Sequence, residues 1–269
     1  MAFTFATLAG NPEFRNHEQA PKIIPDPLSI PFEIPIGMLR ESYEMLYLDV
    51  IQSLENQLTD PNVTRSFMQA VEIRQRLFRQ NRANACILDP YDMFSDHVMI
   101  RRRADHRIVS YLRVTSMSEC RKHELLYPLE NLKKESAGLA EPLAEFLNCG
   151  KEPLHMGYMC LEPTLRKELD GIKLIELYAY LGFRCSGFPL DSVAISATLN
   201  VKYHMDQWMR DAGTWLDGAA DFKHPTIPEV HRVMLIPKLR ENYWPDQHAK
   251  FDAFYTSLKW DGEDSRKVA

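Results

Sequence analysis

The stretch HVMIRRRADHRIVSYLRVT, residues 97–115, decides the fold because it predicts a β-hairpin near the middle of the chain. Val, Ile, Tyr and Leu dominate both of its ends, and these residue types favour β-strands. A charged segment at residues 103–105 indicates the turn between strands over residues 97–100 and 108–115. The second strand carries Arg113 near its end, so we expect this arginine to project from a strand.

Helices and strands are predicted on both sides of the hairpin. Upstream, apolar residues at steps of three and four over residues 67–78 predict a helix, with Thr64 or Asp60 as its cap. Downstream, the patterns predict helices at 138–147, 172–183 and 199–212, and strands at 154–161, 192–195 and 230–236. Gly157 lies inside the first of these strands and indicates a bulge. This mixture predicts one main α+β domain.

The N-terminal segment differs in composition from the rest of the chain. Six of the seventeen prolines fall within residues 1–36, a density that favours an extended arm. Apolar residues at helical spacing over residues 38–58 then predict an amphipathic helix. We expect an arm with an extra helix over 1–60, the main domain over 61–240 and a helical tail over 241–269.

The composition is that of an ordinary globular protein and argues against several classes of function. The chain has 269 residues and a formal net charge of -5, so it lacks the basic surface that nucleic-acid binding needs. Five scattered cysteines and nine dispersed histidines predict neither a disulfide framework nor a metal site. The chain has neither an apolar run of about 20 residues nor a signal-peptide pattern. We therefore expect a cytoplasmic protein with no integral membrane segment.

One group of charged and aromatic residues suggests a chemistry. Its members are Arg74, Phe78, Asp89, Asp92 and Arg113. Their order resembles that of the acyl-homoserine-lactone (autoinducer) synthases and the related N-acyl amino acid synthases, a branch of the GNAT acyltransferase superfamily. The resemblance covers residues 70–200 at the level of pattern. It implies a GNAT-like fold, with a central mixed β-sheet flanked by helices, and it implies amine acylation as the reaction.

Two short segments favour the N-acyl amino acid synthases within this branch. Residues 95–97 place His97 shortly after a Tyr-Asp pair, and residues 127–130 read Tyr-Pro-Leu-Glu. Both features resemble the subgroup that is associated with exosortase systems. We therefore expect an enzyme closer to this subgroup than to a true autoinducer synthase.

The two aspartates allow a functional and a structural interpretation. In the family that the sequence resembles, the Asp-x-x-Asp carboxylates contact the amine substrate, and residues equivalent to Arg74, Phe78 and Arg113 belong to the same site. An Asp-Pro sequence also commonly forms a turn that its own side chains cap. Arg113 presents a planar fork of donors that can fix a pocket floor beside Asp89 and Asp92, or it can be an exposed strand residue.

The chain departs from the family pattern on the next strand. Where the family has Glu-x-x-Arg, this sequence has His155 and Tyr158. Amine acylation needs a group that takes a proton from the amine, and a histidine can do this. We expect His155 or His97 as the catalytic base and Tyr158 as the acid that protonates the leaving thiolate. For either histidine the alternative is a hydrogen-bonded residue of the core.

The motif for the acyl donor is only partly present. The family's loop binds pyrophosphate at a helix N-terminus, and residues 166–171 keep its arginine and last glycine but have Leu169 at the middle glycine. We expect Arg166, Lys167 and Gly171 to bind the donor, which is acyl carrier protein phosphopantetheine or acyl-CoA. No further cofactor is expected.

These features predict an N-acyltransferase that moves a fatty acyl group to the amine of an amino acid or similar small molecule. One alternative is an N-acetyltransferase that depends on acetyl-CoA, which would need a competent loop at residues 166–171. The other is a non-catalytic GNAT-like binding or regulatory protein, which the loss of Glu-x-x-Arg favours.

Overall fold

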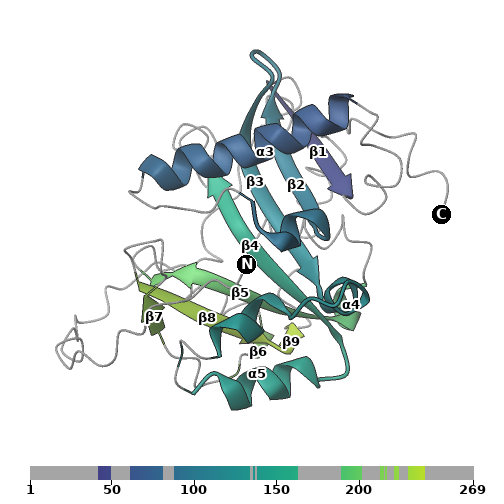
Figure 1. Cartoon of the computed structure of the whole chain (residues 1–269), viewed down its shortest axis with the longest axis vertical. Coiled ribbons are helices and arrows are strands. Elements are labelled where there is room, and N and C mark those ends of the chain that lie inside the picture. The colour runs from purple at the N-terminus through teal and green to yellow at the C-terminus, as the bar shows by residue number, and fades with distance from the viewer. Residues whose placement is uncertain are drawn as a thin grey trace, which may run out of the picture.

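The computed structural model describes a β-sheet and the helices that cover one of its faces (Figure 1). The described residues are 42–49, 61–80, 88–133, 136, 138–162, 189–201, 213–214, 216, 221–223 and 230–239. The strands are β1 (Tyr43–Asp49), β2 (Asp96–Arg102), β3 (Arg107–Ser116), β4 (Glu152–Leu161), β5 (Val193–Asn200), β6 (Gly213–Thr214), β7 (Asp221–Lys223), β8 (Val230–Ile236) and β9 (Lys238–Leu239). The main sheet has the order β1-β2-β3-β4-β5-β8-β7, and β6 pairs with β9.

The sheet is mixed, as predicted. Neighbouring strands run antiparallel except β4 and β5, which are parallel. The predicted hairpin is confirmed as β2 and β3, whose turn includes His106 at a φ of 54°. The strands predicted near residues 154–161, 192–195 and 230–236 are confirmed as β4, β5 and β8, and β5 extends further than predicted. The α+β class and the central mixed sheet are thereby confirmed.

β1 shows that one prediction was wrong. Residues 43–49 do not form part of an amphipathic helix but a strand that pairs antiparallel with β2 along its whole length. The apolar residues here fit either a helical period or a strand period. Leu46 belongs to the apolar stripe of the predicted helix, whereas Leu46 and Leu48, two residues apart, share one face of a strand. Both are buried against the core, so pairing with an otherwise open sheet edge outweighs helical propensity. The rest of the helix predicted over residues 38–58 and the arm over residues 1–36 lie outside the described residues.

A bulge interrupts the pairing of β4 with β3, where Gly157 suggested one. Arg113 of β3 pairs with Gly157 of β4. Two residues earlier on β3, Tyr111 pairs with Cys160, so β4 has one extra residue between these pairs. Tyr158 at this point has a φ of 52°, in the left-handed region that non-glycine residues rarely adopt.

β4 and β5 separate beyond the first half of β4. Their parallel pairing begins with Glu152 opposite Val193 and ends with Met156 opposite Ala197. β4 continues to Leu161, and Figure 1 shows the two strands diverging toward their C-terminal ends. Among the described strands, none pairs with this second half of β4 on the side of β5. Backbone groups of β4 at the divergence therefore have no described partner strand on that side.

The described helices are α3 (Pro61–Gln80), α4 (Met117–Lys122) and α5 (Ala140–Leu147), with 3-10 helices η3 (Pro90–Met93), η4 (Pro128–Leu132) and η5 (Leu190–Ser192). α3 and α5 confirm the helices predicted at 67–78 and 138–147. The prediction of a helix over 199–212 was wrong at its start, because Leu199 and Asn200 are the last two residues of β5. Residues 202–212, the helix predicted at 172–183 and the tail over 241–269 lie outside the described residues, and the three-segment division stays a prediction.

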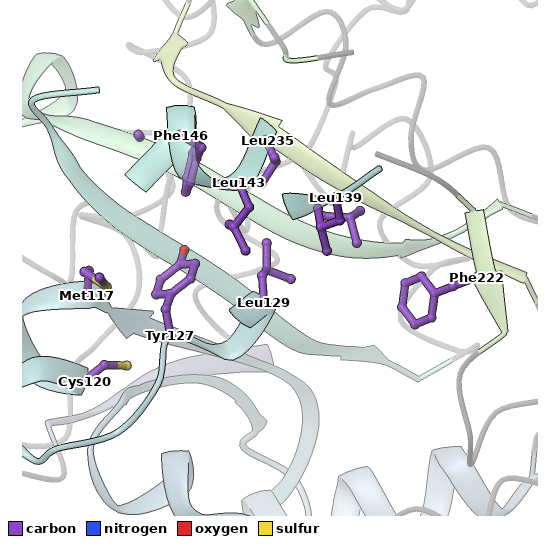
Figure 2. Packing of buried hydrophobic residues seen from close by; sticks show 11 residues of the cluster. Met117, Cys120, Tyr127, Leu129, Leu139, Leu143, Phe146, Phe222 and Leu235 are labelled. Carbon is purple, nitrogen blue, oxygen red and sulfur yellow. The ribbon is translucent and has the colours of Figure 1, made fainter. Parts of the chain in front are cut away.

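Two apolar clusters cover the two ends of one sheet face. α3 packs on β1, β2, β3 and β4 through Leu46, Leu48, Ala70, Ile73, Met99, Ile108, Tyr111 and Cys160. Figure 2 shows the second cluster, in which α4, η4 and α5 pack on β5, β7 and β8 through Met117, Cys120, Tyr127, Leu129, Leu139, Leu143, Phe146, Ala194, Phe222, Val233 and Leu235. Each fully buried Leu or Phe side chain contributes about 2–3 kcal/mol to folding.

A row of polar residues lies on the same face between the two clusters. Residues that pair directly across neighbouring strands share a face. His97 pairs with Arg113, and His155 pairs with Thr115 on one side and Ser196 on the other. The sheet thus presents His97, Arg113, His155 and Ser196 in the space between the clusters.

No described helix is long and apolar enough to cross a membrane.

Candidate active site

Four elements bring the predicted polar residues together over the centre of the sheet. Arg74 comes from α3, Asp89 and Asp92 from η3 and its cap, Arg113 from β3 and Tyr158 from the bulge of β4. All five side chains join one hydrogen-bonded network. The spacing in the sequence thus identified residues that meet in space, and their role in substrate binding stays a prediction.

Asp92 is the buried centre of this network. Arg74 donates from Nη1 to Oδ1 at 2.6 Å and from Nη2 to Oδ2 at 2.9 Å, a bidentate pair. Arg113 donates from Nη1 to the same Oδ1 at 2.7 Å. The Asp92 side chain is 0% exposed, so loss of the carboxylate would leave two buried cations short of a partner.

Asp89 is the more accessible carboxylate of the pair. Its Oδ1 accepts from Nη1 of Arg113 at 2.6 Å, and its Oδ2 accepts from the Tyr158 hydroxyl at 3.1 Å. The Asp89 side chain is 20% exposed, whereas the Arg113 side chain is only 4% exposed. The Asp89 side chain therefore lies at the edge of a buried ionic network and is more exposed than that of Asp92.

The structural interpretation of the Asp-Pro turn also holds. Asp89 caps η3, because its Oδ1 accepts from the backbone N–H of Tyr91 at 2.9 Å. Asp92 completes a capping box by accepting from the backbone N–H of Asp89 at 3.0 Å. The same two carboxylates therefore order the turn and bind the arginines, so the two interpretations of the sequence are compatible.

The charges in the network balance one another. Burial disfavours the charge of Asp92, but the hydrogen bonds and charges of Arg74 and Arg113 outweigh it and hold the pKa of Asp92 below its usual value. Burial likewise opposes the charge of Arg113, yet Asp89 and Asp92 raise its pKa above the usual value. The pKa shifts of Asp92, Arg74 and Arg113 thus all favour the charged forms of these three groups.

Aromatic rings enclose both guanidiniums. The guanidinium carbon of Arg113 lies 4.6 Å from the centre of the Tyr158 ring and 5.6 Å from that of Tyr91. Arg74 lies 4.7 Å from the Tyr158 ring centre and 5.3 Å from that of Tyr111. Such contacts stabilise a cation by about 0.5–2 kcal/mol each. The left-handed backbone of Tyr158 is what places one ring against both arginines.

His97 is buried beneath the network. Its Nε2 lies 2.9 Å from the backbone oxygen of Asp92, which can only accept, so Nε2 carries the proton. Its Nδ1 lies 2.8 Å from the Tyr111 hydroxyl. Burial, together with the charges of Arg113 and Arg74, lowers the pKa of His97 to about 4. Both ring nitrogens are thus engaged by neighbouring groups, and the predicted role of His97 as a base stays a prediction.

His155 lies deeper along the same face. Its Nδ1 is 3.0 Å from Oγ of Ser196, which is 2.6 Å from the Tyr127 hydroxyl. Burial, and to a lesser degree the charge of Arg113, lowers the pKa of His155 to about 3. His155 is therefore neutral at physiological pH. Its Nε2 has no hydrogen-bond partner among the residues that the structure describes.

Tyr158 keeps its proton in this environment. Its hydroxyl donates to Asp89, and burial together with the negative charge of Asp89 raises the pKa of Tyr158 above its ordinary value. A tyrosine in this state can give a proton to a stronger base such as a leaving thiolate. Its predicted role as an acid stays a prediction.

Several predicted residues are not placed by the structure. The donor residues Arg166, Lys167 and Gly171 lie outside the described residues, and Phe78 lies on α3 with its side chain outside the description. Within the described part of the chain, no group of three or more His, Cys, Asp or Glu residues could hold a metal ion.

Sequence reasoning missed the residues that support His155. Tyr127 belongs to a segment that the sequence marked only for its resemblance to a subgroup, and Ser196 lies in a strand with no motif. They meet His155 because β4 pairs with β5 and because η4 folds over that pair. Tyr91 was also missed as a site residue. It lies inside the Asp-Pro-Tyr-Asp motif, so its position in the sequence could have identified it.

Comparisons with known proteins find similar solved structures but no similar sequence. No family model matches the chain, and no curated protein sequence matches it. FeeM, an N-acyl amino acid synthase from uncultured soil microbes, superposes with a TM-score of 0.47 at 11% identity, over 72% of this chain and 90% of that chain. An acyl-CoA N-acyltransferase from Pseudomonas aeruginosa gives 0.46 and 14%, over 72% and 99%. The AHL synthase LasI gives 0.43 and 12%, over 81% and 95%.

These structures include both groups that the sequence resembles. At such identities and TM-scores the likeness concerns the fold and assigns neither substrate nor donor. The chemistry proposed below therefore depends on the geometry of the site itself.

Proposed function

We propose that this chain is an N-acyltransferase that moves a fatty acyl group from acyl carrier protein or acyl-CoA to the amine of an amino acid or similar small molecule. The observation that carries the proposal is the position of the Asp89 network. It lies at the bulge of β4, at the point where β4 and β5 diverge. A partly exposed aspartate side chain, a tyrosine hydroxyl and strand backbone with no described partner strand on one side thus lie at one place.

The amine binds at Asp89 in this proposal. The exposed part of the carboxylate accepts a hydrogen bond from the ammonium group, while Arg113 and Tyr158 hold the carboxylate in place. After loss of one proton to water, the neutral amine attacks the carbonyl carbon of the thioester. The C–N bond forms as the C–S bond breaks, and the leaving group is a thiolate.

The remaining protons move through Asp89 and Tyr158. The attacking nitrogen gives its surplus proton to Asp89, and Tyr158 gives its own proton to the thiolate. Because Oδ2 of Asp89 lies 3.1 Å from the Tyr158 hydroxyl, the proton on Asp89 then restores the tyrosine. The products are an amide and a free thiol, and no charge accumulates in the buried site.

The thioester lies along β4 beyond Met156, where the strand has left β5. Backbone N–H groups at such a divergence can hydrogen-bond the carbonyl oxygen and stabilise the negative charge that develops on it. The loop at residues 166–171 would hold the phosphate of the donor. No cofactor beyond the acyl donor takes part in the proposed reaction, and the cytoplasmic location stays a prediction.

Two alternatives make different predictions for the donor. An acetyl-CoA-dependent N-acetyltransferase would bind acetyl-CoA in preference to long-chain donors. A non-catalytic GNAT-like binding or regulatory protein would bind a small amine at Asp89 without turning over any thioester. The second alternative is supported by one observation, which is that His155 and Tyr158 replace the family's Glu-x-x-Arg.

Thermal unfolding of the purified full chain with acyl donors tests the proposal. An enzyme that binds its donor is stabilised through mass action, by about 2.7 kcal/mol at a hundredfold excess over Kd. We expect long-chain acyl-CoA or acyl carrier protein to raise Tm, and free thiol to appear once a mixture of amino acids is added. No response to any acyl donor, with a folded protein, would contradict the proposal.

Matched variants locate the reaction. Asp89→Asn keeps an N-cap residue of equal quality but removes the charge, so donor binding should persist while thiol release falls on the order of a hundredfold. Arg102→Ala breaks an exposed Arg102–Asp105 pair in the β2–β3 turn and serves as the control. Equal loss of thiol release in both variants would argue against a specific role of Asp89.

A further inference from the structure

The guanidinium of Arg113 uses only part of its donor set. Its hydrogen bonds to Asp89 and Asp92 both leave from Nη1. Its Nε is buried and has no hydrogen-bond partner in the part of the chain that the structure describes. Nε and Nη2 form the edge through which arginine binds a carboxylate with two parallel hydrogen bonds. Arg113 is only 3% exposed, so this unused edge lies inside the protein.

The hydrogen bonds around His155 determine which ring nitrogen carries its proton. Tyr127 is fully buried, and Ser196 is the only hydrogen-bond partner of its hydroxyl among the described residues, so Tyr127 donates to Ser196. The Ser196 hydroxyl then donates to Nδ1 of His155. A neutral imidazole that accepts at Nδ1 carries its proton on Nε2. His155 therefore presents an N–H donor from Nε2.

Gly157 leaves space between these two donors. A Cβ at this position would lie 3.6 Å from Nε2 of His155 and 3.8 Å from Nε of Arg113. Both are ordinary contact distances, so the space beside Gly157 borders on both groups. Arg113 pairs with Gly157 across β3 and β4, and His155 lies two residues earlier on the same face.

We propose that this space binds the carboxylate of the acyl acceptor, which accepts hydrogen bonds from the free edge of Arg113 and from Nε2 of His155. The inference rests on the proposed function and narrows its acceptor to an amino acid. Nη1 of Arg113 holds Asp89, so the amine at Asp89 and the carboxylate at Gly157 lie around one guanidinium. An amino acid, which carries both groups on one carbon, can reach both.

The subsite explains how the acceptor is selected. A simple alkylamine binds at Asp89 but leaves the N–H donors of Arg113 and His155 without partners in a buried site. Sites built to hydrogen-bond a substrate group discriminate strongly against analogues that lack it. Tyr127 and Ser196 are positioning residues in this scheme, because they hold His155 in the tautomer that donates.

Binding of reaction products to the full chain tests the subsite without relying on turnover. The probes are N-acylglycine, which has a carboxylate, and N-acylglycinamide, its neutral counterpart, over a series of acyl chain lengths. We expect the wild type to bind the carboxylate probe about ten to a hundred times more tightly than the amide. Because stable products carry no tetrahedral oxyanion, this preference measures the carboxylate alone.

Gly157→Ala is the sharpest variant for this measurement. The added methyl occupies the subsite at contact distances of 3.5–3.8 Å, so the fold is kept while the carboxylate is displaced. We expect the preference for N-acylglycine to vanish and the affinity for N-acylglycinamide to change far less. A preference that persists in Gly157→Ala would overturn the proposal.

The His155 variants provide a second test that is independent of Gly157. His155→Gln places an amide N–H near the position of Nε2 and should keep most of the preference, whereas His155→Leu should reduce it about tenfold. Histidine-selective ¹⁵N NMR reads the tautomer directly, and it should show the Nε2–H form in the wild type and its loss in Ser196→Ala. An Nδ1–H form in the wild type would overturn the proposal.

The outcomes separate this inference from the proposed function. If the wild type binds N-acylglycine and N-acylglycinamide equally well, the carboxylate subsite is refuted while acyl-amide binding stands. If it binds neither probe at any chain length, the proposed function fails and the inference fails with it.

Discussion

Two aspartates three residues apart in one turn have different surroundings, and this difference defines their roles. Asp92 is fully buried and neutralises Arg74 and Arg113, whereas Asp89 is 20% exposed and contacts Arg113 and Tyr158. Asp92 thus maintains the network, and we propose Asp89 as the residue that binds the substrate. The sequence pattern Asp-x-x-Asp gives no sign of this division, because it depends on which carboxylate α3 and β3 enclose.

Substitution by asparagine should separate the two roles. Asp92→Asn removes the negative charge that pairs with the two buried arginines. We therefore expect the free energy of unfolding to fall by about 3–5 kcal/mol. Asp89→Asn keeps the cap and faces solvent, so we expect a fall of about 1 kcal/mol or less. Urea denaturation of the two variants measures the difference. Equal losses would show that Asp92 is no more enclosed than Asp89.

Stability should fall as the pH falls below about 6.5. The pKa of His97 is about 4 and that of His155 about 3 in the folded state, below the ordinary value of 6.5. Between these values the unfolded chain binds more protons than the folded chain, so the free energy of unfolding rises with pH. Each histidine contributes a slope of up to about 1.4 kcal/mol per pH unit. Because the pKa of Asp92 is also lowered in the folded state, protonation of this carboxyl decreases the free energy of unfolding further at lower pH.

Denaturation at a series of pH values between 7 and 4 measures this slope. His97→Gln should decrease the slope by the contribution of one histidine. Leu126→Ala, at a leucine that is 56% exposed, is the control and should keep the wild-type slope. A wild-type stability that does not change between pH 6.5 and 5 would contradict the neutral, buried state of both histidines.

At the scale of elements, the sequence predicted those whose apolar pattern has one clear period. The β2–β3 hairpin has two runs of strongly β-forming residues on either side of a charged turn. In α3, apolar residues recur every three or four positions. β1 was missed because Leu46 fits both a helical and a strand period, and only pairing with the edge strand β2 decides between them. Pairing of this kind is a tertiary interaction, which local pattern does not contain.

Leu48 tests the strand assignment of β1. It is 7% exposed and belongs to the cluster under α3, whereas it falls outside the apolar stripe of the helix predicted over residues 38–58. Leu48→Ala should therefore lower the free energy of unfolding by about 2–4 kcal/mol. Leu126→Ala, at a leucine that is 56% exposed, is the matched control and should have little effect. Equal, small effects of both substitutions would favour the helix.

At the scale of the whole molecule, the two apolar clusters create the place for a polar site. α3 covers one end of the sheet face, and α4, η4 and α5 cover the other (Figure 1). Arg113, His155 and Ser196 lie in the row between them, next to the bulge and to the divergence of β4 from β5. The buried charges are thus satisfied by one another, while Asp89 alone among the carboxylates of the network is partly exposed.

The sequence predicted the charged part of this site but not the neutral part. Arg74, Asp89, Asp92 and Arg113 carry a recognisable spacing, because ionisable residues are few and distinctive. The Tyr127–Ser196–His155 chain spans 69 positions in sequence and exists only because three separate elements pack together. Its role in directing the proton of His155 could be inferred only from the geometry.

Comparative mass spectrometry of lipid extracts tests the central claim most directly. Cells would express the wild type, Asp89→Asn, Arg113→Ala or the Arg102→Ala control, each with the folded protein quantified. We expect new N-acylated amino acids in the wild type and in Arg102→Ala, and their loss in the other two variants. No new N-acylated species in the wild type, or equal amounts in wild type and Asp89→Asn, would contradict acyl transfer at this site.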